Sequence, residues 1–387
     1  MALMPIPKSR PAADARGEEV APATPAKRTT IQDVARSAGV SVSAVSKVLR
    51  GAYGVSPQMQ ERVSTAIEEL DYRPHAAARS MRGRSYTVGV SVTELVTPFQ
   101  PEVAQGVTDF LHGTGFQAIV VASGVTGERQ QRAAEALLDR GIDGLIIIAP
   151  FSSAEWLEQL GASIPLVVVA RHGPATSFDT VVDDDHLGAH LIVDHLVGLG
   201  HRRIAHTSHP SGGLERPSVL SHTARCDGYI EAMRKHGLEP DVIETFYSDA
   251  GGYAAAQEAL ARPEPPTAIF AGADIAALGV LRAADGRGLA VPDDLSVTGY
   301  DNIYASAIGG VSLTTVDQSA SLTGTISGRL LLERINGRAR PVHYVVSPRL
   351  EVRKTTAAPA AVSRLAAAGS LGPGSALGPG GRRARWR

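Results

Sequence analysis

Residues 29–54, TTIQDVARSAGVSVSAVSKVLRGAYG, predict two short helices joined by a glycine turn, and the second helix has two unlike faces. At about 100° per residue, its apolar half holds Ala44, Val45, Val48 and Leu49, and its other half holds Val42, Ser43, Ser46, Lys47 and Arg50. The apolar half can pack against a core. The other half then stays free to contact a second molecule.

The expected helix ends agree with this periodicity. Thr30 and Asp33 have the spacing of a capping box, Gly39 suits the turn, and Ser41 can cap the second helix. Two helices joined in this way form a helix-turn-helix, in which the second helix enters the major groove of DNA. The alternative is a small structural domain with a charged surface.

A third helix is expected directly after this pair. Ser56 can be its N-cap and Pro57 its first residue, and one face carries Met59, Val63, Ala66, Ile67 and Leu70. Residues 28–84 contain nine Lys or Arg and five Asp or Glu, a net charge of plus four, whereas the whole chain has minus one. Because phosphate attraction supplies most non-specific DNA affinity, this local charge favours DNA binding over the purely structural alternative.

The segments IQDVARSAGVSVSAVSKVLRG and VSPQMQERVSTAIEELDYRPHAAARSM resemble the DNA-binding region and hinge of the lactose repressor family of bacterial transcriptional regulators. The resemblance covers roughly sixty residues without gaps and continues through the large domain to about residue 353. It implies a small all-α helix-turn-helix headpiece followed by an α/β domain of two lobes with parallel sheets, like the periplasmic binding proteins.

The resemblance also assigns DNA-contacting positions. It implies that Val42, Ser43 and Lys47 read bases, with Lys47 as the candidate for guanine, and that Ser41 and Ser46 hold the flanking phosphates. The family usually has Arg at the position of Lys47, and Asn at the positions of Arg50 and His75, which are further DNA-binding candidates here. These departures leave the operator sequence open, since Lys cannot make the two-pronged contact of Arg.

Residues 74–82 match the hinge of the family, which folds into a short helix only when two subunits lie side by side on DNA. Nine residues are too few for a stable isolated helix, so folding must be coupled to binding. Met81 occupies the place of the Leu that enters the minor groove, and Ala78 and Arg79 would line the groove beside it. From the residues alone, an exposed linker is an equal alternative.

From Tyr86 onward the composition changes to short apolar strands alternating with helical stretches. Strands are expected at residues 88–92, 118–122, 144–148, 166–169, 204–207, 268–271 and 295–298. Alternating strands and helices predict parallel, doubly wound sheets, and about 260 residues exceed what one such sheet commonly uses. Two lobes are therefore expected, with a ligand cleft at the carboxyl ends of their strands.

Several polar residues follow these strands or open the next helix, and they match effector-contacting positions of the family. The effector-binding candidates are Phe99, Arg171, Arg225, Tyr247, Asp274 and Asp301, of which Phe99 and Tyr247 are the aromatic faces. Carboxylates and guanidinium groups bind hydroxyl-rich ligands, so a sugar suits this set. Two Arg and two Asp favour a neutral ligand, although an acid held by both Arg is an alternative. Ala170 stands where the family commonly has Asp.

Three other kinds of site find little support in the sequence. Gly113, Gly115 and Ala118 have dinucleotide-binding spacing but precede an expected strand instead of following one. The histidines at 186, 190 and 195 share a helix, but no further metal-ligand pattern accompanies them, and a solvated helix face explains them better. No serine has the sequence of a nucleophile elbow. We therefore expect no cofactor, no metal and no enzyme activity.

Five segments are expected: an N-terminal extension (1–27) and a tail (354–387) that are both disordered, a helix-turn-helix domain (28–73), a hinge helix with its linker (74–85), and a two-lobed effector-binding and dimerisation domain (86–353). The lone Cys226 excludes an internal disulfide, and residues 1–27 lack an apolar run long enough for export. These features predict a cytoplasmic protein.

The function expected from these observations is that of a ligand-responsive, sequence-specific DNA-binding regulator that represses a carbohydrate-utilisation operon. Its partners would be palindromic double-stranded operator DNA, a small effector such as a sugar, and a second copy of the chain in a homodimer, without a membrane. An activator of the same family and a regulator that responds to a non-sugar metabolite are the alternatives.

Overall fold

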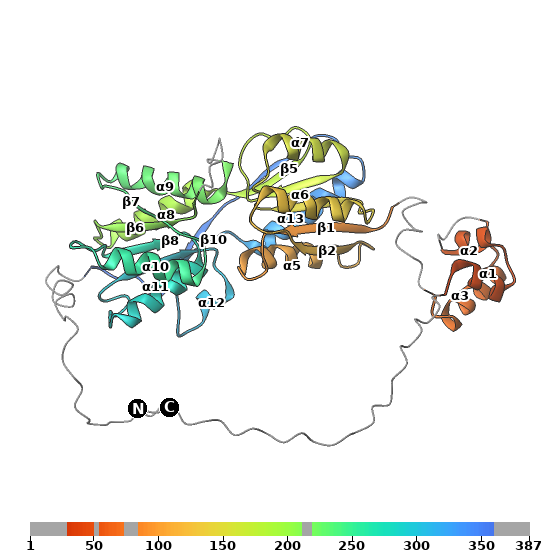
Figure 1. The fold of residues 1–387 in the computed structure, drawn as a ribbon, viewed down its shortest axis with the longest axis horizontal. Coiled ribbons are helices and arrows are strands. Elements are labelled where there is room, and N and C mark those ends of the chain that lie inside the picture. Colours follow the sequence, from red (N-terminus) through yellow and green to blue (C-terminus); the bar gives the residue numbers. More distant parts are fainter. Residues whose placement is uncertain (1–28, 50–53, 73–83, 211–218, 360–387) are drawn as a thin grey trace, which may run out of the picture. The chain divides into compact units, whose positions relative to one another are not determined.

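The structure is a computed structural model that describes residues 29–49, 54–72, 84–210 and 219–359 (Figure 1). The chain divides into two compact units, residues 1–78 and 79–387. The described part of the first unit, residues 29–49 and 54–72, is called the headpiece.

The headpiece consists of α1 (Ile31–Ala38), α2 (Val42–Leu49) and α3 (Pro57–Glu69). Its helix ends are those expected from the sequence: Thr30 and Asp33 form a capping box, and Gly39 ends α1 with a left-handed φ of 62°. The Oγ atom of Ser41 accepts a hydrogen bond from the Ala44 amide at 3.2 Å. Buried apolar side chains from all three helices form one small core, to which Tyr72 is added from the segment after α3.

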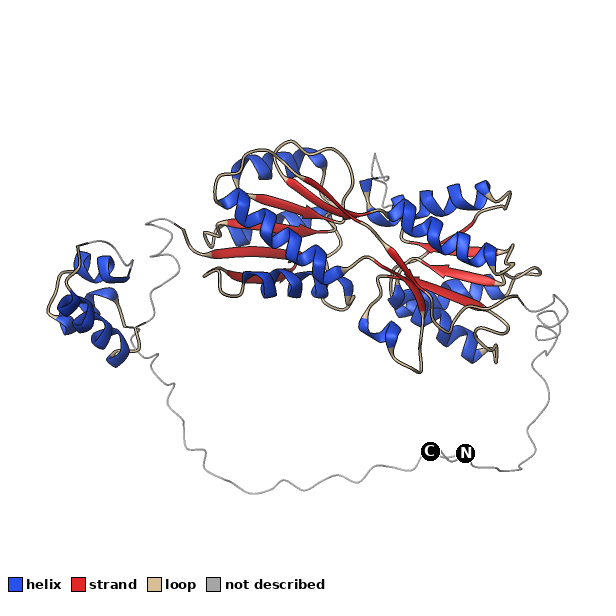
Figure 2. Cartoon of the chain, turned by 180° about the vertical axis from the view of Figure 1, so that it is seen from behind, coloured by secondary structure: helices blue, strands red, loops and turns tan. Residues whose placement is uncertain are grey.

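The second unit contains two lobes, each built on a six-stranded sheet with helices on both faces (Figure 2). Lobe 1 has the strand order β11-β5-β4-β3-β1-β2, and its strands all pair in parallel. These strands are β1 (Thr87–Val92), β2 (Gln117–Ala122), β3 (Gly144–Ile148), β4 (Leu166–Val169), β5 (Asp179–Asp183) and β11 (His343–Val346). Its helices are α5 (Phe99–Leu111), α6 (Gly127–Leu138), α7 (Ala154–Ser163) and α13 (Ala320–Ile335).

Strand β3 shows how the apolar runs of the sequence build this lobe. Ile146 and Ile148 join the core beneath α5 and α13, whereas Leu145 and Ile147 join the core beneath α6 and α7. A strand buried on both faces needs no polar alternation, which explains the continuous run GLIII. Helices α5 and α13 meet at Gly106 and Gly324, where an added Cβ would collide with the backbone of the facing helix.

Lobe 2 has the strand order β12-β10-β9-β8-β6-β7, parallel except for β12. Its strands are β6 (Ile204–Ser208), β7 (Asp241–Glu244), β8 (Ala268–Ala271), β9 (Ser296–Tyr300), β10 (Thr314–Asp317) and β12 (Arg349–Glu351). Helices α8 (Asp185–Gly198) and α9 (Ser221–Lys235) cover one face, and α10 (Asp249–Leu260) and α11 (Asp274–Gly286) cover the other. A short helix, α12 (Tyr304–Ala307), follows β9.

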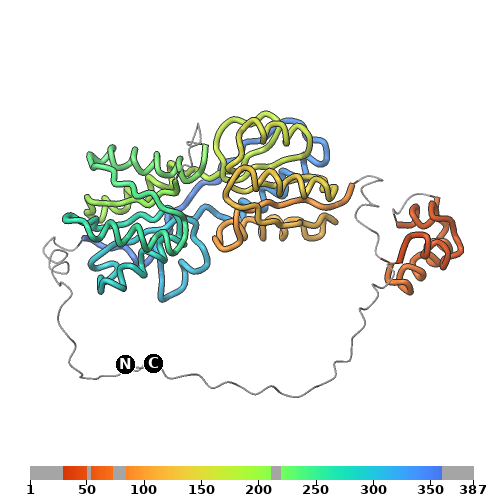
Figure 3. The backbone as a smooth tube through the Cα atoms, viewed as in Figure 1, coloured from red at the N-terminus to blue at the C-terminus, as the bar shows by residue number. Residues whose placement is uncertain are grey.

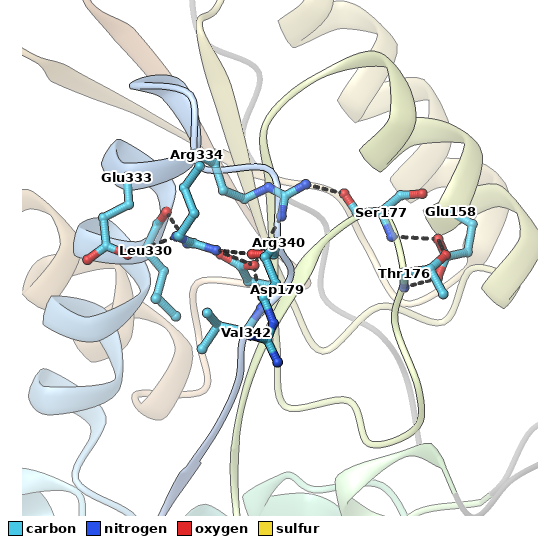
Figure 4. Close-up of polar contacts among 10 residues, drawn as sticks. Glu158, Thr176, Ser177, Asp179, Leu330, Glu333, Arg334, Arg340 and Val342 are labelled. Carbon is cyan, nitrogen blue, oxygen red and sulfur yellow. Dashed lines mark hydrogen bonds and ion pairs between the residues drawn. The ribbon is translucent and has the colours of Figure 1, made fainter.

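The chain passes between the lobes at three places, after β5, after β10 and after β11 (Figure 3). Lobe 1 therefore contains β11 and α13 from the C-terminal part of the chain. The carboxylate of Asp179 at the start of β5 joins them: it accepts hydrogen bonds from Arg334 at 3.1 Å, from Arg338 and from the Val342 amide at 2.9 Å (Figure 4). Asp179 is fully buried and paired with two guanidinium groups, so its charge is compensated.

The seven strands expected from the sequence are all present, and the headpiece and two-lobed α/β fold are confirmed. Five strands were not predicted: β5, β7, β10, β11 and β12. Each carries polar residues, and β7, β11 and β12 are also sheet edges, so these five sequences lack the apolar runs that predict the other seven.

The expected bounds of the large domain, 86 and 353, are too narrow. At its start, the Ser85 amide donates to the carboxylate of Asp143 at 2.9 Å. At its end, the Val297 amide donates to the Thr355 carbonyl at 2.8 Å, and the Ala357 amide donates to Ser296 at 3.1 Å. Residues 355–357 therefore belong to lobe 2 and not to the tail. The proposed hinge and both expected disordered ends lie largely outside the described residues.

Candidate functional site

Helix α2 presents a polar face to solvent. Ser41, Val42, Ser43 and Lys47 are exposed, whereas Val45 is fully buried in the headpiece core. The hydroxyls of Ser41 and Ser43 lie 2.8 Å apart, so the start of the helix carries a small hydrogen-bonding group next to the Val42 side chain. One cation, two hydroxyls and one apolar side chain thus lie on the face that the sequence assigned to DNA.

The face differs from the expected one at two positions. Ser46 is only 4% exposed, whereas Leu49 is 38% exposed. The buried side of α2 therefore includes Ser46, which follows the fully buried Val45 directly. The headpiece conformation does not offer Ser46 to a phosphate. The other DNA-binding candidates, Arg50, His75, Ala78, Arg79 and Met81, lie outside the described residues.

The second unit contains a cavity of about 360 Å³ between its lobes. Lobe 1 contributes residues that follow β1, β3 and β4, and lobe 2 contributes residues that follow β6, β7, β8 and β9. The cavity lies at the carboxyl ends of parallel strands, where doubly wound folds bind ligands. Its walls combine four aromatic side chains, two imidazoles and a few polar groups, namely Phe99, Phe151, Phe246, Tyr247, His209, His222, Thr93, Glu94, Thr97, Gln100, Ser221, Ser248, Arg225, Asp301 and Gln318.

Four of the six predicted effector residues line this cavity: Phe99, Arg225, Tyr247 and Asp301. Arg225 is buried, and its guanidinium group lies 3.5 Å from the centre of the Tyr300 ring. Nη2 donates to Asp185 at 2.8 Å, and Nη1 donates to the Gly272 carbonyl. The Asp301 carboxylate accepts from the side-chain amide of Gln318. Burial raises the pKa of Asp301 well above its usual value, although the charge of Arg225 opposes this effect.

Arg171 does not line the cavity, contrary to the prediction. Its side chain is buried, and Nη1 donates to the Pro150 carbonyl at 3.0 Å. Its backbone forms an antiparallel bridge with Leu220. Burial lowers the pKa of the Arg171 guanidinium. The preceding residue, Ala170, lines the cavity instead, and its left-handed φ of 56° turns the chain directly after β4.

Asp274 does not line the cavity either. It is fully buried at the start of α11, where one carboxylate oxygen accepts from the Ile303 amide at 2.9 Å and from Ser306 at 2.6 Å. The other oxygen accepts from Thr315 at 2.5 Å. Burial raises the pKa of Asp274 to about 6. The carboxylate therefore fastens the segment after β9 to α11, and Ala273 before it is the residue that faces the cavity.

Sequence reasoning missed five prominent cavity residues, namely Phe151, His209, His222, Phe246 and Gln318. Phe151 and His209 follow β3 and β6, so the rule that ligands bind at strand ends could have found them. Gln318 follows β10, a strand that was not predicted. His222 lies one helical turn before Arg225 on α9, and only the three-dimensional structure shows that both face the same space.

The cavity contains buried polar atoms that the protein itself does not satisfy. Among the described residues, Thr97 Oγ1, Ser221 Oγ, His222 Nε2 and Tyr247 Oη have no hydrogen-bond partner within the protein, and all four side chains line the cavity. Burial lowers the pKa of His222 to about 3 and raises the pKa of Tyr247 to about 12, so both side chains are neutral near pH 7. A buried group of this kind is costly unless something hydrogen-bonds to it.

The aromatic and histidine side chains of the cavity also contact one another. The His209 ring lies edge-on to Phe246, with centroids 5.2 Å apart, and edge-on to Tyr247 at 5.7 Å. The His222 ring centre lies 5.1 Å from that of His209 and 6.5 Å from that of Phe151. Flat apolar surfaces therefore stand beside the unsatisfied donors and acceptors, so the cavity suits a ligand that is polar at its rim and apolar on a face.

Two family models match the chain. The first, bacterial regulatory proteins of the lacI family, matches residues 30–75, and the second, a periplasmic binding protein-like domain, matches residues 193–356. The chain is 33% identical to the catabolite control protein A of Priestia megaterium over 333 residues, which are 84% of this chain and 99% of that protein. The chain therefore belongs to the lacI family of DNA-binding transcriptional regulators.

Solved structures agree with this assignment. The lac repressor dimer bound to operator and the anti-inducer ONPF matches with a TM-score of 0.75 and 29% identity, covering 86% of this chain and 100% of that one. The complex of the transcriptional regulator CelR with cellobiose matches with a TM-score of 0.63 and 31% identity, covering 85% and 100%. In the part of the chain that the structure describes, no helix is both long and apolar enough to span a bilayer.

Proposed function

We propose that this protein is a repressor whose operator binding is controlled by a sugar held between the two lobes. One observation carries the proposal: unsatisfied hydrogen-bonding atoms of four side chains stand beside aromatic walls in a cavity at the strand ends. A sugar matches both features, since its hydroxyls can donate and accept while the C–H face of its ring packs on an aromatic side chain. The CelR complex with cellobiose supports this choice of ligand.

The charges of the cavity favour a neutral effector. Arg225 is already paired with Asp185, and His222 is neutral, so neither offers an uncompensated charge to a ligand. An anionic effector would therefore find no uncompensated positive charge at these two side chains, and burying its charge without a partner is costly. A polyol needs only hydrogen bonds, which the four unsatisfied groups and Gln318 can supply.

A thermal-shift screen of the full chain against mono- and disaccharides, cellobiose included, tests the proposal. A ligand that binds the folded state raises the melting temperature by mass action. The ligand should then lose affinity in Tyr247→Phe, which removes one unsatisfied hydroxyl but keeps the ring. Tyr253→Phe is the matched control, because Tyr253 lies on α10 and does not line the cavity. A sugar that stabilises both variants equally would bind elsewhere.

For DNA, we propose that Val42, Ser43 and Lys47 contact base edges and that Ser41 contacts a phosphate. Their exposure on one face of α2 supports these roles. The resemblance to the family further assigns Arg50, His75, Ala78, Arg79 and Met81 to the DNA, with the last three in the minor groove. Release of a labelled palindromic operator when the sugar is added would link the two activities.

The same proposal includes assembly and location. A palindromic operator requires a symmetric protein, so we propose a homodimer formed through the large domains, as the lac repressor dimer on its operator suggests. We propose that residues 1–27 are an N-terminal extension and that residues 74–85 are the hinge. The residues after 359 would form the C-terminal tail. We propose a cytoplasmic regulator at the nucleoid with no catalytic activity. Light scattering of the full chain should give the mass of a dimer.

A further inference from the structure

Three side chains from different parts of the second unit form a continuous chain of polar contacts that ends in the cavity. His172, which follows β4, has its Nε2 atom 2.8 Å from one carboxylate oxygen of Asp185. The other carboxylate oxygen of Asp185 accepts from Arg225 Nη2 at 2.8 Å and from Arg225 Nε at 3.1 Å. Arg225 lines the cavity between the lobes, whereas His172 and Asp185 do not.

The three groups differ in their access to solvent. The side chain of Asp185 is fully buried and that of Arg225 is 5% exposed, but that of His172 is 25% exposed. His172 lies at the edge of a separate cavity of about 410 Å³ that His343 also lines. It is thus the member of the chain that can exchange a proton with solvent, while Asp185 lies at the passage of the backbone from lobe 1 to lobe 2.

We propose that His172 is a positioning residue for the effector cavity: through Asp185 it holds the Arg225 guanidinium in place, and its protonation sets how firmly that group is held. The identification of the cavity as an effector site rests on the proposed function, whereas the His172–Asp185–Arg225 coupling does not. Asp185 is paired with Arg225 as a carboxylate, so its hydrogen bond with a neutral His172 is already charge-assisted. A protonated His172 adds ionic attraction to that bond, so Asp185 is most firmly fixed when His172 is charged.

The surrounding charges favour protonation of His172. Burial opposes it, but the hydrogen bond and charge of Asp185 outweigh burial and the repulsion of Arg225, so the pKa of His172 is raised. Asp183 on β5 accepts from the Tyr300 hydroxyl at 2.7 Å, and Tyr300 in turn stacks on Arg225. His343 on β11 faces the same outer cavity, and its Nδ1 atom hydrogen-bonds to Thr180 instead.

The sign of the effect follows from these contacts. Below the raised pKa of His172, the imidazolium and Arg225 both hold Asp185. As the pH rises through that pKa, the charge on His172 is lost and Asp185 is held less firmly on one side. We expect the affinity for a bound effector to fall about threefold to tenfold over this range.

A test that needs no ligand follows the Arg225 Nε–H signal by NMR in the full chain labelled with ¹⁵N-arginine, with the signal assigned from Arg225→Lys. In the wild type the signal should move with the titration of His172, measured on ¹³C-labelled imidazoles. His172→Gln keeps a donor for Asp185 but carries no charge and cannot titrate, so the Arg225 signal should stay near its basic position at every pH. His172→Phe removes the donor, and the signal should move or broaden.

His343→Gln is the matched control and should leave the Arg225 titration unchanged, because His343 has no contact with Asp185. The proposal is overturned if the Arg225 signal does not shift between pH 5.5 and pH 8.5 while His172 titrates. It is also overturned if His172→Phe and the wild type give the same Arg225 signal. Calorimetry with cellobiose, at pH 6 and pH 8, adds the functional readout. If cellobiose does not bind, the sugar assignment is weakened, but the NMR result still decides the role of His172.

Discussion

The exposed polar face of α2 and the cavity between the lobes differ in how much their residues contribute to the packing of the protein. On α2, Val42, Ser43 and Lys47 are exposed and contribute little to the headpiece core. In the cavity, Arg225 is buried, pairs with Asp185 and stacks on Tyr300, so it takes part in the packing of lobe 2. A change on α2 should therefore alter DNA binding without altering stability, whereas a change around Arg225 should alter both effector binding and stability.

The largest effect is expected from breaking the buried ion pair between Arg225 and Asp185 beside the cavity. Asp185→Ala leaves the Arg225 charge buried without a carboxylate, and removing one partner of a buried ion pair costs about 3–5 kcal/mol. Denaturant unfolding followed by circular dichroism should show the large domain destabilised by this amount. Asp227→Ala on the same helix as Arg225 is exposed and should have almost no effect. Equal stability of both variants would remove the energetic contrast between the two regions.

The next effect belongs to the headpiece. Lys47→Ala should weaken operator binding by about 1–3 kcal/mol and relax the preference at one base pair of each half-site, since a base contact carries discrimination. Fluorescence anisotropy with a set of single-substituted operators measures both quantities, and the unfolding free energy should not change. Arg62→Ala, an exposed change on α3, is the control. A loss of equal size on every operator would make Lys47 a phosphate contact.

The third prediction concerns the pH dependence of the stability of the large domain. Burial and the charge of Asp185 raise the pKa of Asp183 to about 7, so the folded chain keeps a proton that the unfolded chain releases near pH 4. Folding takes up this proton between pH 4 and 7, and Asp183 therefore lowers stability as the pH rises through that window. Asp183→Asn removes the titration while its amide oxygen can still accept from Tyr300.

Relative to wild type, Asp183→Asn should gain at least about 1 kcal/mol of unfolding free energy between pH 4 and pH 8, since each unit of difference in pKa between the folded and unfolded chain is worth about 1.4 kcal/mol. Chemical unfolding at both values gives the difference. Asp139→Asn serves as the control because Asp139 is exposed at the end of α6, and its relative stability should not depend on pH in this way. A gain that is the same at pH 4 and pH 8 would mean that Asp183 is ionised throughout.

The headpiece and the large domain also differ in how much of their structure the sequence predicts. The caps of the headpiece helices join residues three apart, as in Thr30 with Asp33, so the order of residues reveals them. The helical wheel nevertheless placed Ser46 on the wrong side, because the orientation of α2 depends on its packing against α1 and α3. Local patterns predicted the element and its ends but not its rotation.

In the large domain, the strand-end rule correctly placed Asp301 at the cavity but failed for Arg171 and Asp274. The family resemblance supplied Phe99, Tyr247 and Arg225, which also line the cavity. Both failures are one-residue errors, since the neighbouring Ala170 and Ala273 face the cavity instead. The contacts of His172 with Asp185 and of Asp185 with Arg225 span 13 and 40 residues. Packing alone brings them together, and no spacing in the sequence indicates it.

The smallest expected effect concerns the start of α1. Thr30 accepts from the Asp33 amide at 3.3 Å, and the Asp33 carboxylate accepts from the Thr30 amide at 2.9 Å. Thr30→Ala should lower headpiece stability by about 1 kcal/mol, the usual cost of losing an N-cap, while Thr30→Ser should cost only a fraction of that. Thr65→Ala, an exposed change within α3, is the control. Thermal unfolding of the headpiece signal measures the loss, and the lobes should keep their stability. If Thr30→Ala instead destabilised the lobes as much as the headpiece, the two regions would not behave as the independent units on which the comparison depends.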